Sequence, residues 1–148
     1  MKYFAYGSNM DSQRMNKRHV SFSQRVHAVL KGYTLAFNKV ASDDPREGKA
    51  NIVPKIDGIV EGVLYEIPES DLPKLNIHEG FPRHYYHKTV TVQTDSDASF
   101  NSLTYVAQPD KIREGLKPTR EYLGHLIAAQ DILTKTYIKK LESLETLD

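Results

Sequence analysis

The sequence predicts an α+β protein in which a curled or closed sheet forms first and most of the helices follow. Segments rich in β-branched and aromatic residues, several of them alternating at period two, dominate residues 2–107. From residue 118 the apolar residues recur at helical spacing instead. Because strands come first and helices mainly last, an α+β arrangement is favoured over alternating βα units. The length of 148 residues suits one domain with a real core, so we expect a single domain over residues 1–148.

The strands are predicted from the apolar pattern, in chain order. The first spans 2–6, and a glycine turn separates it from a short helix over 10–15, where capping residues precede spaced apolar ones. Residues 28–38 alternate on both sides of Gly32, which suits a strand with a bulge or bend. Further strands are expected at 49–54, 59–67, 85–93 and 102–107. The loop-rich stretches 41–49 and 94–101 are predicted to be surface excursions.

Three more helices are predicted from spacing and capping signals. Residues 69–78 place Leu72 and Leu75 on one face, with Gly80 as the stop. Pro118 suits the first position of a second helix, whose apolar stripe is Tyr122, Leu123, Leu126 and Ile127. Thr134 is predicted to cap a last helix that carries Tyr137, Ile138, Leu141 and Leu144.

Composition excludes several classes of function. Twenty Lys and Arg against 19 Asp and Glu leave a formal charge of +1, which provides no strong field for nucleic acid or an anionic membrane. The absence of cysteine excludes disulfides, thiolate catalysis and sulfur-ligated zinc, and it fits a reducing compartment. The apolar runs are too short to cross a bilayer, and Met1-Lys2 leads directly into a strand. We therefore expect a cytoplasmic protein with neither a nucleic-acid nor a membrane partner.

The turn Tyr6-Gly7-Ser8-Asn9 lies where the first strand ends and a helix begins. Backbone N–H groups in such a turn can converge on one anion, and glycine allows the anion to approach closely. The same residues also serve as ordinary turn and cap chemistry. The turn by itself leaves both interpretations open.

A second candidate is Glu79 in the sequence His78-Glu79-Gly80. Its position at a helix end, between Ile77 and Phe81 and shortly before two tyrosines, favours partial burial. Burial raises the pKa of a carboxyl group toward the range useful for proton transfer. The alternative is a solvated glutamate beside a capping glycine.

Other chemistries are less well supported by the same residues. His78, His84 and His87 lie near Glu79, but the paired-histidine spacing of zinc proteases is absent, so no metal is expected. Ser8 lacks the context of a G-x-S-x-G elbow, which argues against a serine hydrolase. The basic run RMNKR at 14–18 is interpreted as a solvated helix face.

Taken in order, six segments resemble the γ-glutamylcyclotransferase family: YFAYGSNM at the start, GYTLAFN at 32–38, GKANIVP at 48–54, EGVLYEI at 61–67, HEG at 78–80 and PTREYLG at 118–124. The resemblance implies a small, mixed, barrel-like sheet with helices packed around it. It also implies a reaction in which the α-amine of a γ-glutamyl compound attacks its own γ-carbonyl and releases 5-oxoproline. That reaction requires no metal, thiol or cofactor.

The resemblance also implies roles for individual residues. Glu79 would be the general acid/base, and the turn of Tyr6, Gly7, Ser8 and Asn9 would hold the α-carboxylate end of the substrate. Tyr122 would line the same pocket, although its position is equally consistent with a core tyrosine on an amphipathic helix. The family has a pocket tyrosine shortly after the glutamate. Here Tyr85 and Tyr86 both qualify, and the spacing from Glu79 favours Tyr86.

The implied partner is a small-molecule γ-glutamyl compound, and the protein is expected to be a monomer or a homodimer. YGSNM resembles the branch that acts on γ-glutamyl amino acids more than the YGTL form of the branch that acts on γ-glutamyl amines. A non-catalytic binding or regulatory protein on the same fold remains the alternative. The sequence leaves the leaving group open, because its pocket would be built by loops.

Overall fold

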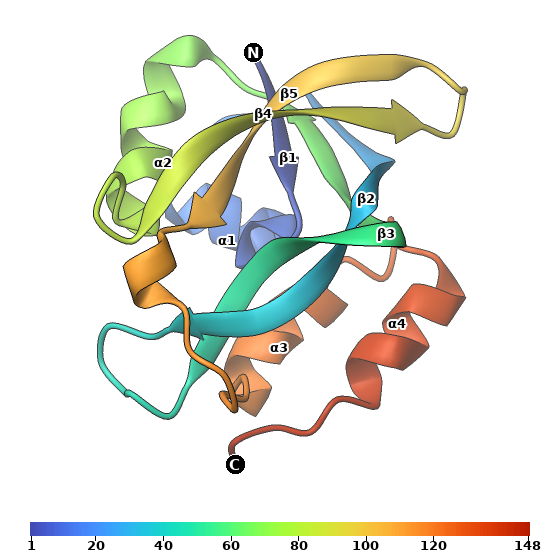
Figure 1. The fold of residues 1–148 in the computed structure, drawn as a ribbon. Helices are drawn as coiled ribbons and strands as arrows, with labels where there is room; N and C mark the ends of the chain where they lie inside the picture. Colours follow the sequence, from blue (N-terminus) through green and yellow to red (C-terminus); the bar gives the residue numbers. More distant parts are fainter.

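Five strands form a closed, mixed barrel in the computed structural model, which describes residues 1–148. The strands are β1 (Lys2–Ala5), β2 (Gln24–Val40), β3 (Gly48–Glu66), β4 (Tyr85–Thr94) and β5 (Ser99–Ala107), in the spatial order β1-β3-β2-β4-β5 (Figure 1). All pairs are antiparallel except β1 with β5, which meet in parallel at Tyr3 and Leu103 and close the barrel. The predicted α+β class with a barrel-like sheet is confirmed.

The longest element is the hairpin of β2 and β3, which corrects two of the predicted strands. Residues 49–54 and 59–66 belong to one strand, β3. Residues 55–58 between them have no partners on β2: the register passes from Lys31–Ile59 to Tyr33–Pro54, so this stretch bulges out opposite Gly32, and the φ of Asp57 is 61°. The sequence pattern therefore located the bulge but missed that the strand continues on both sides of it. The predicted irregularity at Gly32 is confirmed: φ is 87° and the register shifts between Lys31 and Tyr33.

The predicted loop at 94–101 is too long, because only residues 95–98 lie outside strands β4 and β5. Strand β5 begins at Ser99, and Ser99 and Asn101 are exposed polar residues that still pair with β4. Only a tight turn joins the two strands, with the N–H of Asp97 donating to the carbonyl of Thr94 at 3.0 Å. At Ser99 and Asn101 the polar pattern reflects solvent exposure and does not mark the end of strand β5.

The first two helices lie on either side of the β2–β3 hairpin in the sequence. A 3₁₀ turn, η1 (Ser8–Met10), precedes α1 (Ser12–Lys17), so the helix begins later than predicted, with Asp11 as its cap. Likewise η2 (Glu69–Asp71) precedes α2 (Leu72–Glu79). Helix α2 ends at Gly80, whose φ of 65° is the left-handed conformation that glycine adopts readily, as predicted.

The last two helices follow a short 3₁₀ turn, η3 (Pro109–Lys111). Helix α3 (Arg120–Ile127) is capped by Thr119, whose hydroxyl accepts from the N–H of Tyr122 at 3.1 Å. Pro118 therefore precedes the cap, and the prediction that it occupies the first helical position is wrong. Helix α4 (Lys135–Glu142) is capped by Thr134, as predicted.

The core fills the barrel and continues beneath the helices. Its most buried side chains include Phe4 and Tyr65 from the sheet and Met10, Met15 and Leu126 from the helical segments. Helices α3 and α4 lie at the end of the molecule opposite to α2 (Figure 1). The turn after β1 packs against α3, so the N-terminal motif is held between the barrel and the C-terminal helices. No helix in the chain is long and apolar enough to cross a membrane.

Candidate active site

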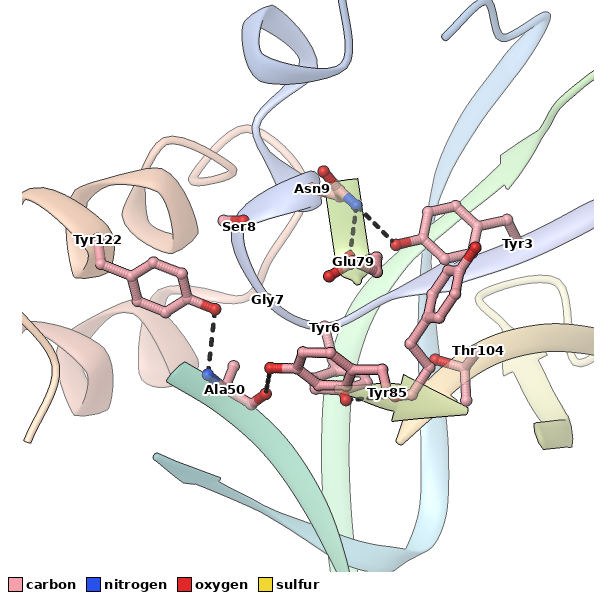
Figure 2. Close-up of a pocket in the computed structure, with 11 residues that line it drawn as sticks. Tyr3, Tyr6, Gly7, Ser8, Asn9, Ala50, Glu79, Tyr85, Thr104 and Tyr122 are labelled. Carbon is pink, nitrogen blue, oxygen red and sulfur yellow. Dashed lines mark hydrogen bonds between the residues drawn. The ribbon is translucent and has the colours of Figure 1, made fainter. Parts of the chain in front are cut away.

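A pocket lies where the end of β1, the C-terminal end of α2 and the start of α3 converge (Figure 2). The structure brings six of the seven predicted site residues to this pocket. The full lining is Tyr3, Tyr6, Gly7, Ser8, Asn9, Ala50, Glu79, Tyr85, Thr104, Tyr105 and Tyr122. Residues separated by more than 100 positions in the sequence thus share one cavity with a single carboxyl group.

Asn9 holds the Glu79 carboxylate by a side-chain hydrogen bond. Its Nδ2 donates to Glu79 Oε1 at 2.9 Å and lies 3.0 Å from the Tyr3 hydroxyl (Figure 2). Arg18 Nη1 donates to Asn9 Oδ1 at 2.7 Å. Since a guanidinium can only donate, this contact fixes the orientation of the amide. One side chain of the predicted turn therefore orients the candidate acid/base.

The environment of Glu79 contains opposing electrostatic influences. Burial raises the pKa of its carboxyl group above the ordinary glutamate value, while the positive charges of Arg18, Arg14 and Lys39 oppose the rise. The tyrosines of the barrel supply the burial. Ile77, which the sequence suggested as a neighbour, is 77% exposed. The carboxyl is thus set into the pocket, and the alternative of a solvated surface glutamate is wrong.

The turn lines the pocket and contains backbone donors that have no partner within it. The first N–H groups of a helical turn have no acceptor within it, and the N–H groups of Gly7, Ser8 and Asn9 donate to no turn, loop or side-chain acceptor. The carbonyls of Gly7 and Ser8 instead accept from Met10 and Asp11, at 3.0 and 3.2 Å. A Cβ on Gly7 would lie 3.1 Å from the Ala50 Cβ and 3.3 Å from the Tyr122 hydroxyl. A side chain at this position would therefore displace the Ala50 methyl group or the Tyr122 hydroxyl, which glycine avoids.

Two tyrosines are fixed on the backbone of Ala50, on the opposite wall. The Tyr85 hydroxyl donates to the Ala50 carbonyl at 2.8 Å, and the Tyr122 hydroxyl accepts from the Ala50 N–H at 3.1 Å (Figure 2). Burial raises the pKa of Tyr122 to about 12, so the hydroxyl keeps its proton at neutral pH. Because this oxygen accepts from Ala50, its proton is free to be donated into the pocket. Tyr122 is also buried in the core, so the two interpretations of it are compatible.

The preference for Tyr86 is wrong: Tyr85 lines the pocket and Tyr86 does not. Adjacent residues of a strand point to opposite faces, so only one of the pair can face the barrel end that holds Glu79. Spacing counted along the chain could not decide between them, because it ignores which face of β4 is inward.

Four further lining residues were missed from the sequence. Tyr3 and Ala50 belong to the quoted motifs YFAYGSNM and GKANIVP and could have been included on that ground. Thr104 and Tyr105 carry no motif and reach the pocket only because β5 closes the barrel against β1. Tyr105 also donates to Asn76 Oδ1 at 2.6 Å, and Tyr6 donates to the Tyr105 carbonyl. Thr104 and Tyr105 reach the pocket because strands distant in the sequence pair, and no local sequence pattern predicts that pairing.

A second opening adjoins the pocket and also reaches Glu79. This outer recess shares Ser8, Glu79, Tyr85 and Tyr122 with the pocket and adds the cations Arg14, Arg18, Lys39 and Lys49. The prediction that residues 14–18 form a solvated face is therefore wrong for Arg14 and Arg18, although Asn16 and Lys17 are exposed.

Of the three histidines near Glu79, His78 and His84 line the outer recess and His87 does not. His87 Nε2 lies 2.7 Å from Asn76 Oδ1, and His78 is exposed on α2. No group of three or more His, Asp or Glu side chains is placed to hold a metal ion.

The fold and the pocket define a closed-barrel protein in which a partly buried carboxylate faces an N-terminal glycine turn. A sequence model of the AIG2-like family matches residues 59–141, more than half of the chain and the part that contains Glu79, Tyr85 and Tyr122. The chain belongs to the AIG2-like family.

Individual relatives agree with this assignment. The Bacillus subtilis (strain 168) protein named "Putative gamma-glutamylcyclotransferase YkqA" is 46% identical over 81 residues, which cover 53% of this chain and 28% of that protein. The matched segment thus spans little more than a quarter of this curated relative. The crystal structure of YkqA has a TM-score of 0.84 at 29% identity, covering 99% of this chain and 55% of that one.

Two other solved structures match almost the whole chain. An uncharacterized protein from Homo sapiens has a TM-score of 0.87 at 26% identity, and a structure named gamma-glutamyl cyclotransferase has 0.86 at 25%. Each covers 99% of this chain and 89% of the other. The resemblance to γ-glutamylcyclotransferases is therefore confirmed.

Proposed function

We propose that this protein is a γ-glutamyl cyclotransferase, which converts a γ-glutamyl compound to 5-oxoproline and a free amine or amino acid. The observation that carries the proposal is Glu79, a carboxyl group with a raised pKa in the same pocket as the unpaired N–H groups of the turn at 6–9. A pocket that only bound its ligand would not need a basic carboxyl beside the anion site. The names of the relatives support the same class of reaction.

The proposed reaction moves two protons from the attacking nitrogen to the leaving nitrogen through one carboxyl group. Glu79 accepts a proton from the α-ammonium, and the free amine then attacks the γ-carbonyl carbon to form a tetrahedral intermediate. The protonated Glu79 gives its proton to the leaving nitrogen as the bond from that carbon to this nitrogen breaks. The ionised Glu79 then takes the second proton from the ring nitrogen, which leaves the neutral lactam, and passes it to the released amine, which departs as an ammonium group. A carboxyl whose pKa lies above its ordinary value serves both steps better than a fully solvated one.

The remaining task is to hold the substrate folded. The nucleophile and the carbonyl already belong to one molecule, so binding them in a near-attack geometry lowers the barrier by several kcal/mol. The N–H groups of Gly7, Ser8 and Asn9 would hold the α-carboxylate, and the Tyr122 hydroxyl would donate to the substrate from the facing wall. Proton transfer and positioning suffice for this chemistry, so we propose a metal-independent reaction.

The test is a panel of γ-glutamyl amino acids and γ-glutamyl amines incubated with the purified protein and assayed for 5-oxoproline. We expect release from at least one class, unchanged after exhaustive chelation and absent with Glu79→Gln. Activity lost on chelation and restored by metal would contradict the metal-independent mechanism. If no compound is cyclised while some bind, the protein is a binding module on this fold.

A further inference from the structure

The outer recess beside Glu79 contains more positive charge than the protein itself neutralises. Arg14, Arg18, Lys39 and Lys49 surround it. Of these only Lys49 has a carboxylate partner, Glu47 Oε2 at 2.9 Å. The other three cations face Glu79 as the one carboxyl group of the recess. Two or more positive charges therefore have no counter-charge when the site contains no ligand.

Lys39 is the most informative of these residues. It is 5% exposed, yet it forms no ion pair and no hydrogen bond, and its ammonium lies 5.5 Å from the centre of the Tyr85 ring. Lysine is almost never buried without a partner, because removing its charge from water is costly. Burial and the nearby Lys111 and Lys49 lower its pKa. Lys39 thus lines the recess with an ammonium group that has no anionic partner, and this group is placed to bind an anion.

Arg14 and Arg18 have free donors in the same recess. Arg14 Nη1 contacts His125 Nε2 at 2.8 Å, while its buried Nε has no partner. His125 is in turn held by Asp11, 2.8 Å from Nδ1, so this carboxylate reaches Arg14 only through the imidazole. Arg18 uses Nη1 for the neutral Asn9 amide. Neither guanidinium is paired with a carboxylate, which is the group it binds best.

The position of these positive charges relative to Glu79 indicates which half of the substrate they contact. The glutamyl α-carboxylate is accounted for by the turn at 6–9, and the scissile γ-carbonyl must lie beside Glu79. The recess is the second opening that reaches Glu79, so it receives the group attached to the leaving nitrogen. Because Glu79 balances one of the three cations, an amino-acid leaving group with one carboxylate would still leave one cation without a counter-charge.

We propose that the leaving half of the substrate carries two or more carboxylates, as an acidic amino acid or acidic peptide does, and that Lys39, Arg14 and Arg18 bind them. This inference rests on the proposed cyclotransferase function. It narrows the substrate to γ-glutamyl compounds with an acidic leaving group. It also makes these cations specificity residues, which take no part in the proton transfer at Glu79.

The test compares γ-glutamyl-glutamate with γ-glutamyl-glutamine, which have nearly the same shape and differ by one charge. We expect kcat/KM for γ-glutamyl-glutamate to be about tenfold higher or more, and this preference to shrink as ionic strength rises. Lys39→Met should reduce the preference, whereas Lys39→Arg should keep most of it. Lys31→Met is the matched control, because Lys31 is an exposed lysine on the same strand outside the recess.

The outcomes separate this inference from the proposed function. Equal kcat/KM for both dipeptides, with 5-oxoproline formed from each, would overturn the acidic leaving group and leave the cyclotransferase intact. If neither dipeptide nor any other γ-glutamyl compound is cyclised, the cyclotransferase proposal fails. In that case the affinities for the two dipeptides, measured by calorimetry, test the charge preference without turnover. Equal affinities would overturn the acidic leaving group as well. The wild-type comparison needs no variant to fold.

Discussion

At Glu79, burial and nearby positive charges act in opposite directions on the pKa of the carboxyl group. Burial alone would make the carboxyl a weak acid, and Arg18, Arg14 and Lys39 limit that effect. Asn9 adds a hydrogen bond that favours the ionised form. The net effect raises the pKa of the carboxyl group, which is the direction that the proposed proton transfer requires. Asn9 belongs to the predicted turn, but its side chain acts on Glu79 as a positioning residue.

Replacing Glu79 by Gln tests the proton transfer at this residue. Glutamine keeps the shape and can still contact Asn9, but it cannot accept a proton at neutral pH. We expect kcat to fall by about two orders of magnitude or more while Kd for the substrate changes little. In the wild type, activity should rise with pH through an apparent pKa above about 4.3, the ordinary glutamate value. Wild-type turnover by the variant would show that Glu79 is not the base.

The same variant makes a separate prediction for stability. Because the folded pKa of Glu79 is raised, the folded state binds its proton more tightly than the unfolded state does, and ionisation destabilises the fold. Stability from this group is therefore full at low pH and is lost as pH rises through the folded pKa. Glu79→Gln should raise Tm at pH 7, and the gain should vanish below about pH 4. A lower Tm at pH 7 would identify a structural carboxylate instead.

At the scale of elements, the turn between β1 and α1 has no spare room. Gly7 approaches Ala50 on β3 and Tyr122 on α3, so it sits where three elements meet. Gly7→Ala should move the turn or the Tyr122 hydroxyl and raise KM by about tenfold or more, since small displacements of positioning groups are costly. Gly124→Ala in α3 is the matched control, because nothing lies within 4 Å of its Cβ. An unchanged KM in folded Gly7→Ala would remove the turn from the site.

Helix α4 is attached to the barrel by a polar cluster around Glu61. This β3 carboxylate accepts from the N–H and hydroxyl of Thr134, at 2.9 and 2.6 Å, and lies 2.9 Å from His27 Nε2. His27 Nδ1 lies 2.6 Å from Asp95. Burial lowers the pKa of His27, but the hydrogen bonds to Asp95 and Glu61 outweigh it and the net shift is upward. For Glu61, burial raises the pKa, while Thr134 and His27 produce a net lowering.

These directions predict how the cluster depends on pH. A raised His27 pKa contributes stability that is full below the unfolded value of about 6.5 and is lost as pH rises through the folded pKa. A lowered Glu61 pKa contributes stability that is full above about 4.3 and is lost in acid. The free energy of unfolding of the wild type should exceed that of His27→Gln by about 1 kcal/mol near pH 5.5. Urea titrations that give the same difference at pH 5.5 and 8.5 would contradict this coupling.

Over the whole molecule, the sequence predicted local features well and long-range ones only through the family resemblance. Helix ends at Gly80 and Thr134 and the irregularity at Gly32 depend on one or two residues, and all were confirmed. The strands at 49–54 and 59–67 were separated at a bulge over residues 55–58, but they belong to one strand, β3. Polarity along the chain reports burial, and it marks the end of an element only where the element is buried.

The candidate site shows the same difference between local and long-range features. Glu79 and the turn at 6–9 were found because each forms a compact motif, and Tyr122 because a longer motif contains it. Tyr85 was passed over for its neighbour, and Lys39 was not singled out, because the inward face of a strand depends on its register in the closed barrel. Thr104 and Tyr105 depend on the contact of the first and last strands. Closure of the sheet is the step that no short stretch of sequence encodes.

Closure therefore gives the prediction that belongs to the whole molecule. Strands β1 and β5 meet at one register pair, Tyr3 and Leu103, and the buried Thr104 hydroxyl adds a hydrogen bond to the Phe4 carbonyl at 2.8 Å. Thr104→Val keeps the side-chain shape and removes that donor. We expect the free energy of unfolding to fall by about 1–3 kcal/mol, as for other buried hydrogen bonds left without one partner. Amide exchange should accelerate in β1 and β5 more than in α4.

The control for closure is Thr89→Val, on the neighbouring strand β4. Thr89 is exposed, its hydroxyl makes no hydrogen bond, and it pairs with Leu103, so it lies close to the seam without contributing to it. Valine is a good strand residue, and this variant should unfold within about 0.5 kcal/mol of the wild type. If the two variants lose equal stability, the Thr104 hydroxyl does not hold the barrel closed. If Thr104→Val alone is destabilised but exchange accelerates equally in every element, the hydroxyl stabilises the fold as a whole and not the seam.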